Sequence, residues 1–146
     1  MDDKEDIKTD QPAPKWFIDL DWYQQNSRSF LTSAQRCLCP KCRERLKIKE
    51  GKTKVTSLLS AFKKCCSKTP EFVTYKLPIL ESIFRYYLAN GNQPLELEEL
   101  GRQLSERRSG DSYGTSVEML TRLLRNDQYY GLRQAPEPGR QTDSQP

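Results

Sequence analysis

Hydrophobic residues recur three and four positions apart along much of this chain, which is the spacing of one face of an α-helix. The pattern is most regular in the second half, where it predicts three helices. The first begins at Pro78 and ends before Gly91, a residue suited to the left-handed position after a helix. The second covers about 95–107, and the third begins at the capping box Thr115-Ser116-Val117-Glu118. The segment 127–133 then fits a short strand or wing.

In the first half the apolar segments are shorter and their period changes. Alternating apolar residues between Trp16 and Trp22 favour a short strand, whereas Asp19 or Asp21 fits the N-cap of a short helix. We interpret the two tryptophans as core residues that pack against the following helix, in preference to an exposed stacking or docking surface.

Two further helices are predicted on either side of a basic stretch. Helical spacing predicts one helix from about Ser29, with Cys37 and Cys39 at its C-terminal end. A second helix begins near Thr56 or Ser57, either of which can cap it, and carries a further pair of cysteines on its apolar side.

The cysteines have the spacing of a metal site. Cys39-Pro40-Lys41-Cys42 is a C-x-x-C knuckle, in which a tight turn brings both sulfurs to one side. Zinc takes four ligands in a tetrahedral array, and thiolates are common in its structural sites. We predict a Zn²⁺ site made by this knuckle with members of the set Cys37, Cys65 and Cys66. Because consecutive helical side chains diverge by about 100°, we expect one of Cys65 and Cys66 to bind the metal and the other to pack.

Two other interpretations of the cysteines stay open, namely buried structural thiols, and redox or Fe–S chemistry. A thioredoxin-like use of the C-x-x-C motif needs a βαβ context, and the pattern predicts none. Five cysteines and an acidic start without an apolar leader favour reduced thiols and a cytoplasmic location.

The composition argues against catalysis and against a membrane span. The chain contains no histidine, which excludes His-based acid–base catalysis and zinc sites with histidine ligands. It also lacks a Gly-rich phosphate loop and a G-x-S-x-G motif. No apolar run approaches the ~20 residues that cross a bilayer. We therefore expect a protein that is not an enzyme and has no membrane partner.

The net charge of +4 is unevenly distributed. Residues 36–68 hold eleven Lys and Arg against two Asp and Glu, a local +9, whereas 77–133 hold seven against eight, a local −1. Such a dense positive block favours contact with the phosphates of nucleic acid or a nucleoprotein, and a solvated charge run is the alternative. The residues predicted to make this contact are Arg43, Arg45, Lys47, Lys49, Lys52, Lys54, Lys63 and Lys64.

These patterns predict a mainly α protein with a small zinc-stapled helical module followed by a three-helix domain. The predicted organisation is a disordered tail over 1–14, the zinc-binding basic module over 15–70, the three-helix domain over 77–133 and a disordered tail over 134–146.

The three-helix domain resembles the winged-helix or helix-turn-helix superfamily. The resemblance is carried by three short helices, the loop before the third, the aromatic segment after it, and a second helix with the pattern of Leu95–Leu104. It implies that the third helix is the one that enters the major groove in DNA-binding members. In this chain Arg122 and Arg125 of that helix are offset by Glu118 and Asp127, so we expect a protein-docking use of the domain.

Together these predictions describe a cytoplasmic, non-enzymatic zinc-binding protein that contacts nucleic acid or a nucleoprotein through its basic half. The alternative is a protein–protein interaction adaptor with a winged-helix docking module and no nucleic-acid role. The salt dependence of nucleic-acid binding separates the two.

Overall fold

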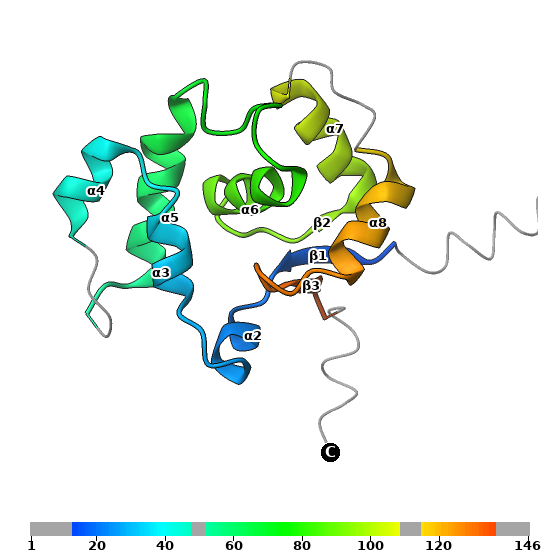
Figure 1. The fold of residues 1–146 in the computed structure, drawn as a ribbon, viewed down its shortest axis with the longest axis horizontal. Coiled ribbons are helices and arrows are strands. Elements are labelled where there is room, and N and C mark those ends of the chain that lie inside the picture. The colour runs from blue at the N-terminus through cyan, green and yellow to red at the C-terminus, as the bar shows by residue number, and fades with distance from the viewer. Residues whose placement is uncertain (1–12, 48–51, 109–114, 137–146) are drawn as a thin grey trace, which may run out of the picture.

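The computed structural model describes residues 13–47, 52–108 and 115–136, and the predicted tails lie mostly outside these ranges. The protein is mainly α-helical, as predicted, with a small three-stranded sheet (Figure 1). The strands are β1 (Lys15–Ile18), β2 (Leu95–Glu96) and β3 (Leu132–Gln134). The helices are α2 (Leu20–Gln25), α3 (Phe30–Gln35), α4 (Pro40–Leu46), α5 (Val55–Lys64), the 3₁₀ helix η1 (Cys66–Lys68), α6 (Ile79–Ala89), α7 (Leu97–Arg107) and α8 (Val117–Arg125).

Strand β1 is the central strand of the sheet although it stands first in the chain. Both neighbours run antiparallel to it, and Trp16 lies opposite Leu95 of β2 and Gln134 of β3. The Asn92 side chain fixes the other end of β1, because it accepts the N–H of Ile18 at 2.8 Å and donates to its carbonyl at 2.9 Å. The N-terminal segment is therefore hydrogen-bonded into the C-terminal half of the protein.

One cluster of buried apolar side chains runs from Trp16 to Leu132. Trp16 and Trp22 are both buried in it, which confirms their assignment to the core. This cluster and strand β1 cross the predicted boundary between 15–70 and 77–133, so the two segments share a core and a sheet. Their division into separately folding domains stays a prediction.

Side-chain caps decide where the first helices begin. Asp19 caps α2 and Ser29 caps α3, each by accepting a backbone N–H from the first turn. Helix α5 has no such cap and begins at Val55. The prediction that Thr56 or Ser57 caps this helix was wrong, because both lie inside its first turn.

The C-terminal helices lie close to their predicted positions. Helix α6 follows Pro78, and Gly91 adopts the left-handed conformation after it, with φ of +77°. Helix α7 begins at Leu97, slightly later than predicted, because the two preceding residues pair with β1. Helix α8 is capped by Ser116, whose hydroxyl accepts the N–H of Met119 at 3.2 Å. The predicted capping box, with its cap at Thr115, was therefore wrong by one residue.

Two details of the third helix and its wing differ from prediction. Helical spacing predicts Val117, Leu120, Leu123 and Leu124 on the apolar face of the third helix. Val117 is 47 % exposed, so this face rests on Leu120 and Leu124, which are fully buried. The predicted strand at 127–133 is shorter and later, since β3 covers only Leu132–Gln134. The residues before it form a loop that the side chain of Asp127 organises.

Candidate metal centre

The first three cysteines follow the end of α3. This helix ends at Gln35, so Cys37 lies in the turn after it. Cys39 is the N-cap residue of α4, and Pro40 occupies the first helical position, which suits its fixed φ and missing N–H. The prediction that one helix carries Cys37 and Cys39 at its C-terminal end was wrong, because α3 stops and Pro40 starts a new helix that carries Cys42.

The second cysteine pair lies where α5 meets η1. Helix α5 ends at Lys64, and Cys65 leaves the helical conformation with φ of −127° and ψ of −64°. Because the backbone turns at Cys65, the divergence of consecutive side chains in a helix does not apply here. The sulfurs of Cys65 and Cys66 both lie beside Cys39, at 3.8 and 3.4 Å from its sulfur.

Three thiols form a group with the spacing of a metal site. The sulfurs of Cys39, Cys42 and Cys65 all lie within 4.8 Å of one another, and none of these cysteines is in a disulfide. A tetrahedral zinc ion with bonds of about 2.3 Å holds its sulfurs roughly 3.8 Å apart. The Cys39–Cys65 separation of 3.8 Å matches that value, so the group needs little rearrangement to surround an ion.

Cys66 adjoins this group from the buried side. Its thiol donates to the sulfur of Cys39 over 3.4 Å, and its sulfur accepts the backbone N–H of Cys39 at 3.3 Å. Cys66 is fully buried, whereas Cys39 and Cys65 are partly exposed. Four thiols thus lie together, with the core behind Cys66 and solvent in front of Cys65.

Cys37 is the one predicted metal residue that the structure leaves apart. Its side chain is buried beside Arg85 and Glu81 of α6. Burial raises the pKa of its thiol to about 11, which keeps it protonated at neutral pH. A neutral, buried thiol away from the other four behaves as a small core side chain.

The pKa values of the clustered thiols follow from their contacts. Burial acts to raise the pKa of Cys39, but hydrogen bonds from the Cys42 backbone and from the other thiols outweigh it and lower the pKa to about 7. Burial raises the pKa of Cys42 and Cys66, and hydrogen bonds to Cys42 and Cys39 raise the pKa of Cys65. Cys39 is therefore the sulfur that becomes a thiolate first, as a metal ligand must.

Arginines of α4 lie next to the sulfurs. One guanidinium nitrogen of Arg45 donates to the sulfur of Cys42 over 3.4 Å. Arg43 donates to the carbonyls of Arg36 and Leu38, at 3.1 and 3.3 Å, and so ties α4 to the turn after α3. These positive groups offset part of the negative charge that several thiolates bring to one place.

The predicted nucleic-acid-binding residues lie on or next to α4 and α5, the two helices at whose ends the clustered cysteines lie. All of them except Lys49, which lies outside the described residues, are exposed. They lie on α4 and its C-cap (Arg43, Arg45 and Lys47), directly before α5 (Lys52 and Lys54) and in the last turn of α5 (Lys63 and Lys64).

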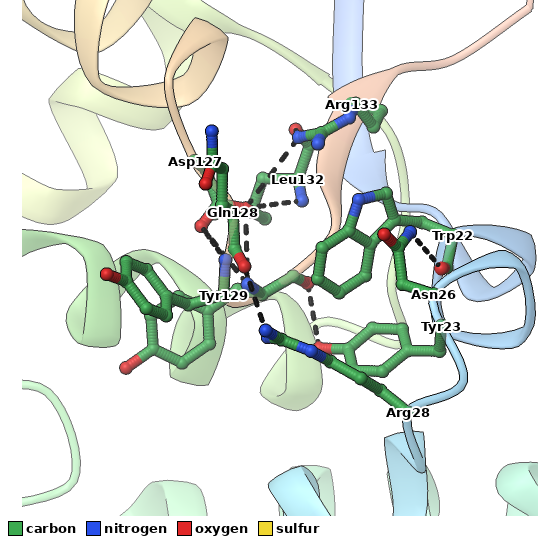
Figure 2. A network of polar contacts seen from close by, with 10 residues as sticks. Trp22, Tyr23, Asn26, Arg28, Asp127, Gln128, Tyr129, Leu132 and Arg133 are labelled. Carbon is green, nitrogen blue, oxygen red and sulfur yellow. Dashed lines mark hydrogen bonds and ion pairs between the residues drawn. The ribbon is translucent and has the colours of Figure 1, made fainter.

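A buried carboxylate organises the loop after α8, and the sequence pattern missed it by assigning this segment to a strand. The Asp127 side chain is fully buried and accepts the backbone N–H groups of Tyr129, Tyr130 and Leu132 at 2.9, 3.1 and 2.9 Å (Figure 2). Arg133 lies 3.9 Å from the same carboxylate. An aspartate that bonds the N–H two residues on is an Asx-turn, and this was the available sequence signal.

No protein-family model matches the chain, and no curated protein or solved structure is significantly similar to it. Within residues 13–47, 52–108 and 115–136, the helices are all too short or too polar to cross a membrane. What bears on function is therefore the chemistry of the cysteines and of the charged surface around them.

Proposed function

We propose that this is a non-enzymatic zinc-binding protein of the reducing cytoplasm, which contacts nucleic acid or a nucleoprotein through its basic N-terminal half. One observation carries the proposal: three sulfurs lie within 4.8 Å of one another without a disulfide, and the sulfur of Cys66 lies 3.4 Å from that of Cys39. In this proposal Cys39, Cys42, Cys65 and Cys66 are the four ligands.

The donor set favours zinc in a structural role. Four thiolates fill the tetrahedral shell of Zn²⁺ and leave no position for water or substrate, as in closed structural sites. The ion would join the N-terminal end of α4, at Cys39 and Cys42, to the junction of α5 and η1, at Cys65 and Cys66. The free energy of metal binding then supports the packing of these short helices.

The charged surface supports the nucleic-acid part of the proposal. Exposed basic residues lie on both helices that the metal joins, α4 and α5. A metal that fixes α4 against α5 also fixes the relative positions of their cations. Phosphate contacts of this kind supply affinity and little sequence information.

The C-terminal half, with its helix–strand–helix–helix–strand order, is proposed as a winged-helix-like module for docking a protein. Exposed Arg122 and Arg125 of α8 share that helix with exposed Glu118, and this mixture of charges favours a protein over a duplex. The alternative function is a protein-interaction adaptor without a nucleic-acid role. It rests on the same mixture of charges on α8.

Metal analysis of the protein, purified under reducing conditions, tests the zinc site. The expected result is one zinc per chain, with removal by a chelator lowering the thermal stability. If the purified protein contained iron and labile sulfide, the cysteines would hold an Fe–S cluster and not zinc. A fully folded, metal-free protein with five titratable thiols would overturn the site.

Binding titrations over a range of salt concentrations test the nucleic-acid contact. On duplex, log Kd should change with log salt by about 0.9 per neutralised phosphate, and by about 0.7 on single strands. Replacement of Lys47, Lys49, Lys52 and Lys54 by Gln should flatten this dependence for all sequences alike. A variant with Arg122→Gln and Arg125→Gln serves as the control and should bind nearly as the parent does. No binding at low salt would leave the adaptor as the function.

A further inference from the structure

Three neighbouring hollows on the surface share walls. The first, of about 480 Å³, lies between α3 and the loop after α8. The second, of about 320 Å³, shares Arg36 and Cys37 with the first. The third, of about 360 Å³, shares Thr69 and Phe72 with the second. Each hollow shares lining residues with the next. We call the three hollows together the cation groove and define it by the residues that line them.

Positive charge dominates the cation groove. Arg28 and Arg36 line its first hollow. The second adds Arg43 and Arg85. The third is lined by Lys63, Lys68 and Arg107. Its acidic residues, among those the structure describes, are Glu71 and Glu81, and Glu81 is already paired with Arg85 at 3.0 Å. A concave surface of one sign concentrates ligands of the opposite charge.

Several of these cations are held in place without being neutralised. Arg28 donates to the carbonyl of Gln128 at 3.1 Å, and Arg43 donates to two carbonyls of the turn after α3. Arg107 lies over the ring of Tyr86, 4.9 Å from its centroid. A carbonyl or an aromatic face orients a guanidinium but leaves its full charge, and a guanidinium has five N–H donors in all. The groove is thus organised before any anion arrives.

An aromatic side chain stands at the first hollow. Tyr129 lines it and is 67 % exposed. The neighbouring Tyr130 is half-buried and packs against Phe84, with 4.8 Å between the ring centroids and the rings tilted by 34°. The loop that presents Tyr129 is held by the buried Asp127 carboxylate, and Figure 2 shows this network beside Arg28. The protein therefore orders a loop whose exposed Tyr129 lines the same hollow as Arg28 and Arg36.

We infer that the cation groove binds single-stranded nucleic acid, with a base stacked on Tyr129 and the backbone phosphates running along the basic residues. Sites for single strands combine a positive groove with aromatic side chains on which bases stack, because every base has a π-face. The inference rests on the nucleic-acid part of the proposed function and specifies the strand state. It also adds Arg28, Arg36, Lys68 and Arg107 to the predicted contacts, of which only Arg43 and Lys63 line the groove.

A single strand fits these features better than a duplex or an acidic peptide. A duplex needs a groove-filling helix or a broad positive face, and α8 carries mixed charge. An acidic peptide accounts for the cations but gives no role to an exposed tyrosine beside them. Peptide binding is therefore an outcome of the test below.

The test uses the metal-loaded full chain and fluorescein-labelled dodecathymidylate in titrations at several salt concentrations. The groove variant combines Arg36→Gln with Lys68→Gln, two exposed residues that line the hollows. It should reduce the log–log salt slope by about 1.4, which corresponds to two phosphates on a single strand. The control, Arg122→Gln with Arg125→Gln, loses the same charge outside the groove and should change the slope by much less.

The stacking contact has its own signature. Tyr129→Ala should weaken oligonucleotide binding by about 5- to 140-fold and leave the salt slope unchanged, whereas Tyr129→Phe should retain affinity. Polyglutamate of similar charge, which has no bases, should be insensitive to Tyr129→Ala. Circular dichroism and thermal melting of each variant confirm that the fold is intact.

Three results would overturn the inference. Parent-like oligonucleotide binding by the groove variant, with loss only in the Lys47, Lys49, Lys52 and Lys54 variant, would refute the groove and leave the proposed function standing. Tighter binding of an acidic peptide than of the oligonucleotide, dependent on the groove cations, would assign the groove to a protein. No binding of any nucleic acid at low salt would remove the inference together with the nucleic-acid function.

Discussion

The backbone N–H of Cys39 donates a hydrogen bond to the sulfur of Cys66, 3.3 Å away and 27 residues along the chain. This bond joins the start of α4 to the start of η1 and uses the sulfur as an acceptor. A sulfur accepts such a bond best when it carries negative charge, as a thiolate ligand does. The relationship therefore supports Cys66, which is fully buried, as one of the ligands we propose.

The first prediction concerns the ligand set. Cys39→Ser and Cys42→Ser should each abolish stoichiometric zinc retention, and so should Cys65→Ser and Cys66→Ser, because the structure brings both of the latter sulfurs to Cys39. This differs from the expectation, based on a continuous helix, that only one of that pair binds the metal. Metal content per chain after gel filtration measures the effect.

Cys37→Ser is the control for these variants. Its side chain faces α6 and not the thiol group, so zinc should stay at one per chain. Retention of full zinc by either the Cys65 or the Cys66 variant would reduce the proposed set to three cysteines and an outside ligand.

Local patterns were sufficient to predict most of the helices and the part of the cysteine cluster made by Cys39 and Cys42. Apolar spacing and end signals such as Gly91 depend on neighbours within one or two turns, which a sequence displays directly. The C-x-x-C knuckle is likewise local. Its turn brings Cys39 and Cys42 together whatever the rest of the chain does.

The same local patterns do not predict contacts between residues that lie far apart in the sequence. The pairing of β1 with β2 depends on where the chain returns after the 76 residues between them. The Asn92–Ile18 hydrogen bonds that fix it join residues 74 apart. The position of Cys66 depended on a backbone turn at Cys65 that apolar spacing does not encode. The cation groove likewise draws Arg36, Lys68 and Arg107 from three separate elements.

The second prediction tests the contact between α7 and Thr115, which lies two residues before α8. A Cβ atom on Gly101 would lie 2.3 Å from the backbone carbonyl oxygen of Thr115, a distance that requires backbone movement. Replacing a helical glycine by alanine ordinarily stabilises a helix by about 1 kcal/mol, but overpacking costs about 1–3 kcal/mol. Gly101→Ala should therefore lower the free energy of unfolding in urea. Ser105→Ala on the same helix should not, and equal unfolding midpoints for the two variants would contradict the contact.

The third prediction concerns alkaline pH. Burial raises the pKa of Tyr87 above its ordinary value of 10.0, and its hydroxyl donates to the carbonyl of Trp16 at 2.7 Å. The phenol keeps its proton more strongly in the folded than in the unfolded protein, because its folded-state pKa is raised. Below pH 10 it is protonated in both states and makes its full contribution to the free energy of unfolding, and this contribution is lost as the pH rises above 10. Tyr87→Phe should cost about 1 kcal/mol at pH 8 through the lost hydrogen bond, and the difference from the parent should shrink above pH 10.

Urea unfolding at pH 8, 9, 10 and 11 measures this difference. Tyr75→Phe, at a tyrosine that is 58 % exposed, is the matched control and should follow the parent at every pH. A constant gap between parent and Tyr87→Phe across this range would show that the phenol does not couple folding to pH.

The fourth prediction concerns the loop that presents Tyr129. The two Asp127 oxygens accept three backbone N–H groups, whereas an asparagine has one acceptor oxygen and turns an NH₂ toward the remaining donors. Asp127→Asn should lower the free energy of unfolding by about 1–3 kcal/mol for each N–H donor left unsatisfied. It should also speed hydrogen exchange at the backbone amides of residues 129, 130 and 132.

Asp127→Asn should also weaken dodecathymidylate binding toward the level of Tyr129→Ala, because the ring is no longer held at the first hollow. Asp19→Asn makes the same chemical change at the N-cap of α2, where asparagine caps as well as aspartate, so its stability should stay near that of the parent. If both variants unfold at the same urea concentration and exchange these amides at the parent rate, Asp127 does not hold the loop. Weakened oligonucleotide binding would then need a cause other than the displacement of Tyr129.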